Sequence, residues 1–252
     1  MKRWISLVTL LILLTTMTAC SSAQEGGQPA QETGEAPAQE SAAPAEGADH
    51  ILIAYFSMPE TDGVDTVASA SRVVVDGQMM GNTQYVASVI ERVTGGDMWR
   101  IETVQTYPGS HEPLLEFAYN ELVENARPEL SGQIENLEQY DVIFLGYPNW
   151  NAELPMPLYS FLEAYDLSGK TIIPFNTHGG SGFSRTIQTI AELEPNAEVI
   201  TEGFTVSRNS VGSSEGDILA WLAQQGYSLD RAVREARSAM DKSNRTERKM
   251  CS

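Results

Sequence analysis

Two kinds of hydrophobic pattern alternate from residue 50 to about residue 227 of the chain. Continuous apolar runs, typical of strands buried on both faces of a parallel sheet, alternate with stretches in which apolar residues recur every three or four positions, as on one face of a helix. The runs predict strands over residues 51–56, 99–104, 141–146, 171–175 and 198–206. The helical stretches predict helices that begin near residues 82, 110, 155, 184 and 215. Five successive strand–helix units indicate a single doubly wound α/β domain over residues 50–227.

The composition narrows the classes of partner. The chain has 252 residues with 16 basic and 34 acidic side chains, which gives a net charge of −18. Nucleic acid is therefore excluded as the main partner, because phosphate contacts need a basic face. Two cysteines cannot form a disulfide scaffold or a four-cysteine metal site, and the three histidines lie too far apart in sequence to suggest metal ligation, so we expect no metal.

The first 20 residues have the pattern of an export signal. Two basic residues precede an apolar run over residues 4–14, which is too short to span a bilayer as a helix and matches the core of a secretory signal. Small residues then precede Cys20 in an arrangement that resembles the cleavage box of bacterial lipoproteins, although Met17 stands where leucine is usual. We expect residues 1–19 to be a lipoprotein signal peptide and Cys20 to carry lipid that anchors the exported protein to the outer face of the cell membrane. The alternative is an ordinary secretory signal beside an incidental cysteine.

Residues 20–49 and 228–252 differ in composition from the domain between them. The first segment consists of small, polar and acidic residues with no aromatic side chain, so it cannot bury enough apolar surface to offset its ordering entropy and is predicted to be a disordered tether. The second holds seven basic and four acidic residues, with apolar positions at the spacing of a short helix. This basic tail is either a solvated helix or a segment attracted to anionic lipid or to the protein's own acidic surface.

The loop after the first predicted strand is the first candidate for a site, because doubly wound sheets bind ligands at the carboxyl ends of their strands, where the strand order reverses. It leads from Ser57 to Gly81 and to a helix start at Asn82, Thr83 and Gln84. A glycine, hydroxyl groups and the free N–H groups of a helix start suit a phosphate group without any cation. The alternative is that Asn82 simply caps the helix.

Two further loops have the chemistry to hold a flat polar ring. After the third strand, a proline-stiffened loop carries Trp150, whose indole offers a stacking platform; the alternative is a tryptophan that covers the core. After the fourth strand, residues 177–182 combine three glycines with two hydroxyl side chains, so the backbone can approach a polar ring edge closely. Because glycine-rich turns are common, this loop alone is weak support for a site.

Together these motifs resemble those of flavodoxin-like proteins, and more closely those of the bacterial group with an insertion in the phosphate-binding loop. The matching stretches are Tyr-Phe-Ser after the first strand, a delayed Gly-Asn-Thr, Gly-Tyr-Pro-Asn-Trp and Phe-x-Thr-His-Gly-Gly-Ser-Gly. The resemblance implies a five-stranded parallel sheet of order 2-1-3-4-5 with helices on both faces, and non-covalently bound FMN. Carried over by position, it implies a phosphate site of Ser57, Gly81, Asn82, Thr83 and Gln84, a ring site of Pro148, Asn149, Trp150 and Asn151, and a pyrimidine-edge site of Thr177, His178, Gly179, Gly180 and Ser181.

Two departures from the family pattern affect the expected site. Residues 58–80 interrupt the phosphate loop, and we expect this insertion to fold over part of the site or to form a partner surface. Asn151, Ala152 and Glu153 follow Trp150 where the family usually has a second aromatic residue and a glycine, so one face of a flavin would be less covered. The negative charge of Glu153 would lower the reduction potential of a nearby flavin.

His178 is the histidine that falls inside a predicted site. It is a candidate catalytic residue that gives a hydrogen bond or a proton to the reduced ring, or else it fixes its own loop. His50 and His111 are expected at the surface or at helix caps.

The sequence therefore favours an exported, membrane-anchored FMN protein that transfers electrons to a redox partner protein or a small electron acceptor. One alternative is an FMN-dependent oxidoreductase that reduces a quinone or another small acceptor. The other is a surface binding module that no longer holds flavin, since a fold alone does not fix function.

Overall fold

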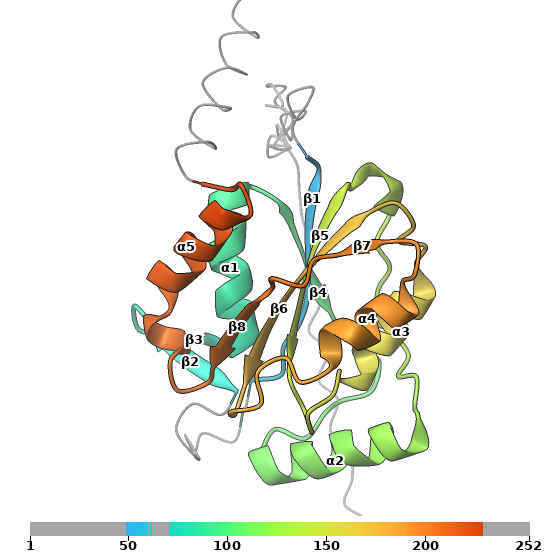
Figure 1. The fold of residues 1–252 in the computed structure, drawn as a ribbon. Coiled ribbons are helices and arrows are strands. Elements are labelled where there is room, and N and C mark those ends of the chain that lie inside the picture. The colour runs from blue at the N-terminus through green and yellow to red at the C-terminus, as the bar shows by residue number, and fades with distance from the viewer. Residues whose placement is uncertain (1–48, 60, 62–70, 229–252) are drawn as a thin grey trace, which may run out of the picture. The chain divides into compact units, whose positions relative to one another are not determined.

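The structure is a computed structural model that describes residues 49–59, 61 and 71–228 (Figure 1). The predicted signal peptide, the lipid attachment at Cys20, the tether and the basic tail lie outside these residues, except for one residue at each junction with the domain. None of the helices in the described part of the chain has both the length and the apolar character that a membrane crossing requires.

A parallel β-sheet forms the centre of the domain. Its strands are β1 (Ile51–Phe56), β4 (Asp97–Ile101), β5 (Val142–Pro148), β6 (Thr171–His178), β7 (Glu198–Val199) and β8 (Phe204–Ser207). The order is β4-β1-β5-β6, and the short strands β7 and β8 both pair with β6. Because β7 and β8 share the fifth position, the sheet has the expected order 2-1-3-4-5, and the predicted doubly wound α/β class is confirmed.

The fifth strand differs from the prediction because it is divided. β7 pairs with the first two residues of β6, whereas β8 pairs with residues 175–178. Pro174 lies between these two stretches and has no N–H to donate to a neighbouring strand. At the same place, a side-chain Cβ on Gly203 would lie 2.4 Å from the Pro174 carbonyl oxygen. The chain therefore leaves the sheet beside Pro174 and rejoins it as β8.

Helices cover both faces of the sheet (Figure 1). α1 (Asn82–Thr94) and α5 (Glu215–Gln224) pack on one face, and α2 (His111–Glu124), α3 (Met156–Ala164) and α4 (Thr186–Leu193) pack on the other. Single 3₁₀ turns, η1 (Leu137–Gln139) and η2 (Val211–Ser213), precede β5 and α5. Successive side chains of β1 alternate between the two cores, so this strand is buried on both faces as its continuous apolar run predicts.

The second half of the insertion forms a hairpin, β2 (Arg72–Val75) and β3 (Gln78–Gly81), that leads directly into α1. Asp76 and Gly77 connect the strands with φ angles of 52° and 77°, as two-residue hairpin turns of the primed type require. Val73 packs into the core beside α1. The backbone N–H of Asn82 donates to the carbonyl of Ser71 at 2.9 Å, so the hairpin also fixes the start of α1.

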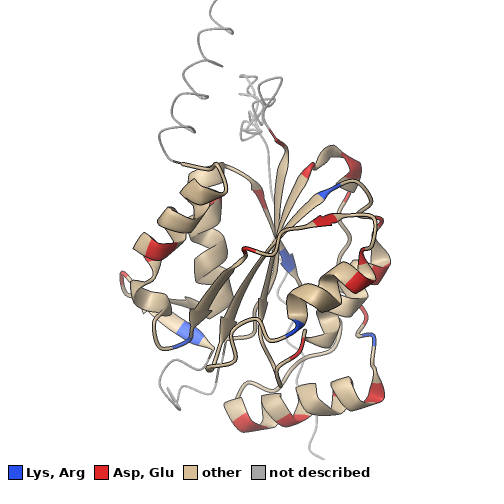
Figure 2. Ribbon diagram, in the orientation of Figure 1, with Lys and Arg blue, Asp and Glu red and all other residues tan. Residues whose placement is uncertain are grey.

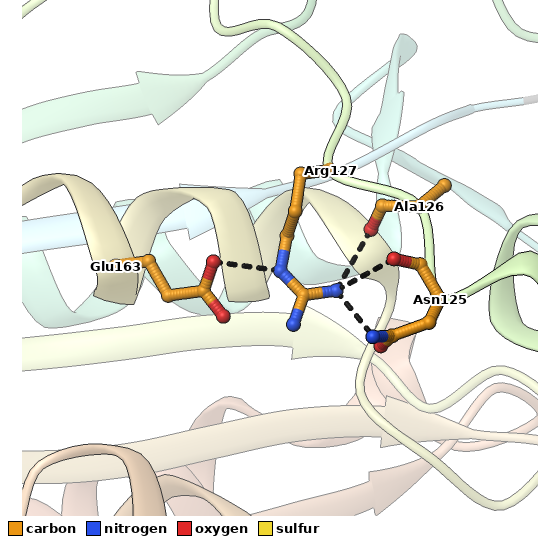
Figure 3. Close-up of polar contacts among 4 residues, drawn as sticks. All are labelled: Asn125, Ala126, Arg127 and Glu163. Carbon is orange, nitrogen blue, oxygen red and sulfur yellow. Dashed lines mark hydrogen bonds and ion pairs between the residues drawn. The ribbon is translucent and has the colours of Figure 1, made fainter.

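Arg127 ties the end of α2 to α3 (Figure 3). Its Nη1 donates to the carbonyl oxygens of Asn125 and Ala126 at 3.1 and 3.0 Å and to the Asn125 Oδ1 at 2.9 Å, while its Nε donates to Glu163 at 2.7 Å. Asn125 caps α2 in the left-handed conformation with φ of 50°, which asparagine tolerates well. One guanidinium therefore holds a helix end, the loop that follows and a second helix together.

Candidate functional site

A pocket of about 410 Å³ opens at the carboxyl ends of β1, β5 and β6. The chain passes to opposite sides of the sheet after β1 and before β5, so the pocket lies where ligands bind in doubly wound folds. The structure brings together residues from all three predicted loops. Those that line the pocket are Ser57, Asn82, Thr83, Pro148, Asn149, Trp150, Asn151, Thr177, His178, Gly179, Gly180 and Ser181.

Gly81 and Gln84 do not line the pocket and instead shape the start of α1. The Gln84 side-chain oxygen accepts the Gly81 N–H at 3.3 Å, so this glutamine acts as a helix cap. A Cβ on Gly81 would lie 2.1 Å from the Ser57 hydroxyl oxygen. The glycine is therefore what allows the end of β1 and the start of α1 to approach each other.

Hydroxyl groups from two elements meet in the lining of the pocket. The Thr83 Oγ1, in the first turn of α1, lies 3.1 Å from the Thr177 Oγ1 near the end of β6. Both threonines and Ser57 are buried. Three hydroxyls beside the N-terminal turn of a helix form a neutral cradle that suits an anion.

Asn149 joins the second and third loops. Its Nδ2 donates to the Gly182 carbonyl at 2.7 Å and to the Ser184 hydroxyl at 3.3 Å, and Asn176 Nδ2 donates to the same carbonyl at 2.9 Å. With both amide hydrogens used, the Asn149 Oδ1 is buried and lacks a hydrogen-bond partner among the described residues. A buried acceptor without a partner costs free energy, so a ligand N–H would stabilise this position.

Trp150 is more covered than a stacking platform would be. Only 8% of its surface is exposed. Its ring packs edge-on against Phe56 with centroids 5.4 Å apart, and against the tilted ring of Tyr107 with centroids 5.9 Å apart. The next two residues, Asn151 and Ala152, both have positive φ angles of 53° and 62°. The chain therefore reverses sharply after the indole, which holds Trp150 against the core and leaves little of it to a ligand.

The comparisons with known proteins identify the family. A family model for flavodoxins matches residues 72–225, which is more than half of the chain. The protein belongs to the flavodoxin family. No curated protein sequence matches it.

Solved structures of flavodoxin type resemble the domain. A protein from Bacteroides eggerthii assigned as a flavoprotein is 26% identical, with a TM-score of 0.51, over 69% of this chain and 96% of the other. A similarly assigned protein from Bacteroides uniformis is 22% identical, with a TM-score of 0.53, over 70% and 99% of the two chains. A flavoprotein from Lactobacillus acidophilus in complex with FMN is 18% identical, with a TM-score of 0.47, over 68% and 97%.

In this flavodoxin-family site, His178 fixes its own loop. Its Nδ1 accepts the backbone N–H of Gly180 at 2.8 Å, and burial lowers the pKa of the imidazole below its ordinary value. The ring is therefore neutral at pH 7, with the proton on Nε2, the nitrogen that Gly180 does not contact. A neutral Nε2–H can donate a hydrogen bond to a ligand, whereas a cationic imidazole that delivers a proton is disfavoured.

Glu153 lies outside the lining of the pocket. Its Oε1 accepts the backbone N–H of Leu154 at 3.0 Å and the Thr189 hydroxyl at 3.2 Å. The carboxylate therefore accepts hydrogen bonds from the turn after Trp150 and from α4. Because Glu153 does not line the pocket, no contact in the structure supports the expected lowering of a flavin potential by its charge.

Two lining residues, Met58 and Ser71, belong to the insertion that was expected to fold over part of the site, although neither was singled out. The other lining residues that the sequence did not predict are His111, Leu114, Leu115, Ala152 and Arg208. His111 begins α2, as expected of a residue near a helix cap, but it also lines the pocket together with two leucines of that helix. No residue pattern in α2 distinguishes these positions from ordinary core positions, because their role depends on how α2 packs against the strand ends.

Proposed function

We propose that this flavodoxin-family protein binds FMN non-covalently in the pocket and transfers electrons outside the cytoplasm, anchored to the membrane through lipid on Cys20. The observation that carries the proposal is the meeting of a neutral hydroxyl cradle, an unpartnered amide oxygen and a glycine-rich loop in one pocket. Family membership supports the same cofactor.

The hydroxyl cradle at the start of α1 fits the phosphate of FMN. The first N–H groups of a helix have no intrahelical partner, and the hydroxyls of Ser57, Thr83 and Thr177 surround the start of α1. The Thr83 and Thr177 hydroxyl oxygens lie 3.1 Å apart, so both hydroxyls could donate hydrogen bonds to the same phosphate group. No charge is needed here, because the helix start itself favours an anion.

Asn149 and the loop of residues 177–181 fit the polar edge of the flavin ring. Asn149 Oδ1 would accept the ring N–H, and backbone groups of residues 177–181 and the Nε2–H of His178 would face the ring carbonyls. Bound FMN would supply the redox chemistry, while the chain's own residues bind it and set the surroundings of its ring. The limited exposure of Trp150 leaves the ring to be covered by other lining groups, including Leu114 and Leu115 of α2.

Titration with FMN tests this proposal. The full chain, extracted from membranes in detergent and freed of flavin, should quench FMN fluorescence with a Kd in the micromolar range or tighter and shift the visible spectrum. Asn149→Ala should weaken binding roughly tenfold, because about 1.5 kcal/mol is lost with a buried hydrogen bond. Asn120→Ala, an exposed asparagine of α2, is the matched control. Absence of saturable binding by folded protein would contradict the proposal.

The membrane anchor is tested separately. We expect the wild-type protein in the membrane fraction and a Cys20→Ala variant, expressed at the same level, in the soluble exported fraction. Retention of both in the membrane fraction would contradict lipid anchoring through this cysteine.

The small-acceptor alternative draws support from the apolar wall that α2 adds to the pocket. Leu114, Leu115 and Met58 would suit an apolar acceptor such as a quinone beside the ring. Steady-state oxidation of a nicotinamide donor with a quinone acceptor distinguishes the two functions: rapid turnover indicates an oxidoreductase, and single reduction without turnover indicates a carrier.

A further inference from the structure

Arg208 lines the pocket, and none of the described residues forms an ion pair with it. It follows β8, and its backbone N–H donates to the His178 carbonyl at 2.8 Å, which extends the pairing with β6 by one residue. The side chain lines the pocket, and its Nε is buried without a hydrogen-bond partner among the described residues. A buried guanidinium N–H without an acceptor is costly, so a ligand acceptor is expected there.

The isolation of Arg208 is unusual within the described part of the chain. Each of the other basic side chains there has an interaction partner. Arg208 instead reaches a pocket in which none of the described lining residues is a carboxylate, in a chain with 34 acidic residues. Among the described residues, the charge of Arg208 is therefore not neutralised.

The guanidinium of Arg208 lies beside Gly179. Three guanidinium atoms, Nη1, Cζ and Nε, are 3.7, 3.8 and 3.9 Å from the position that a Cβ of Gly179 would take. Because these three distances are nearly equal, the planar group lies over the loop that follows β6. This is the loop that Asn149 joins to the neighbouring strand end through the Gly182 carbonyl.

We propose that Arg208 binds the pyrimidine edge of the flavin and stabilises the negative charge that this edge gains when the flavin is reduced. The inference rests on the proposed function. Asn149 offers an acceptor and Arg208 offers donors beside the same loop, which complements a ring edge that carries an N–H between two carbonyl groups. A cation beside a developing anion favours the reduced form and raises the reduction potential.

The test measures the potential and the affinity of bound flavin in wild type, Arg208→Gln, Arg208→Lys and Arg92→Gln, all as full chains in detergent. Arg92→Gln removes the same charge from the last turn of α1, about 15 Å along the helix from its start, where Arg92 pairs with Glu215. Potentials are obtained by spectroscopic reductive titration against a reference dye, with FMN and with riboflavin, which lacks the phosphate.

In Arg208→Gln we expect reduced flavin to bind roughly tenfold more weakly relative to oxidised flavin, which for a two-electron couple is a fall of about 30 mV. The fall should be the same with FMN and with riboflavin. Arg208→Lys should keep most of the potential, because the charge remains, and Arg92→Gln should match wild type. The lysine variant also guards against a glutamine variant that fails to fold.

Three outcomes would overturn the inference. One is an unchanged potential in Arg208→Gln. Another is a loss of affinity for FMN with none for riboflavin, which would place the guanidinium at the phosphate. The third is a wild-type protein that binds no flavin, and this result alone would also remove the proposed function.

Discussion

Glu194 is a buried carboxyl at the end of α4 whose charge state depends on its surroundings. Burial, with a smaller contribution from the charge of Asp166, raises its pKa from 4.5 to about 7. The folded protein therefore holds a proton that the unfolded chain releases near pH 4.5. Stability should fall as the pH rises from about 4.5 to about 7 and then level off, because the native state binds more protons in that window.

Replacement of Glu194 by glutamine should abolish this part of the pH dependence. At pH 8 the variant should be more stable by up to about 3 kcal/mol, from 1.4 kcal/mol per pKa unit, and at pH 4 it should match wild type. Urea unfolding at the two pH values measures the difference. Glu198→Gln, an exposed neighbour, is the control and should change neither value. If Glu194→Gln and wild type were equally stable at pH 8, ionisation of Glu194 in the folded protein would cost no free energy, which would contradict this prediction.

Single residues of the site differ in how far the sequence could predict them. Asn149 directly follows β5, and Thr177 and His178 end β6, so a prediction that places these strands correctly also places the three residues at the pocket. Arg208 also follows a strand, but that strand is divided at Pro174, and the position of its end depends on the pairing of β8 with β6. The burial of Trp150 depends on packing against Phe56 and Tyr107, which are distant in sequence, so it could not be predicted from the residues around Trp150.

At the scale of elements, local pattern was enough for the first four predicted strands and for the approximate starts of the helices, but not for the division of the fifth strand into β7 and β8. Buried parallel strands have long apolar runs, and helices have capping and breaking residues that need no tertiary information. The β2–β3 hairpin was not predicted, although Asp76 and Gly77 between apolar residues are a hairpin signal. The pairing of the hairpin strands and its packing through Val73 on the core are tertiary features.

The Arg127 cluster gives a prediction about how elements are held together. The ion pair with Glu163 is partly exposed, with 32% and 44% of the two side chains accessible, so it contributes at most about 1 kcal/mol, but the guanidinium also satisfies acceptors at the end of α2. The hydrogen bond from the Arg127 guanidinium holds the pKa of the Glu163 carboxyl below its usual range. Arg127→Ala should therefore lower the free energy of unfolding by roughly 1–2 kcal/mol.

Thermal unfolding measures the effect. For a domain of this size the loss corresponds to a fall in Tm of about 3–6 °C. Arg185→Ala is the control, since its pair with Glu192 is longer, at 3.7 Å, and more exposed, and its Tm should stay within about 1 °C of wild type. Equal effects of the two substitutions would mean that the contacts drawn in Figure 3 do not stabilise the loop.

At the scale of the whole molecule, α2 places negative charge beside the pocket. The helix carries four glutamates and neither lysine nor arginine (Figure 2). The same helix lines the pocket with Leu114 and Leu115. Glu112, Glu116 and Glu124 are exposed on it. Charges of one sign around a site attract oppositely charged partners and repel others over about a Debye length, so the effect depends on salt.

The reaction of the reduced, FMN-loaded protein with small oxidants should therefore depend on their charge. The rate constant for a cationic oxidant such as hexaammineruthenium(III) should fall roughly tenfold between low and high salt, and that for anionic ferricyanide should rise. Because the two oxidants differ in driving force, the sign of each salt dependence is the measurement, obtained by stopped-flow absorbance. Replacing Glu112, Glu116 and Glu124 by glutamine should weaken both salt dependences.

If the triple variant keeps the salt dependences of wild type, the net charge of −18 acts from elsewhere on the chain and α2 does not steer partners. If both oxidants respond to salt in the same direction, electrons do not leave through this face of the protein.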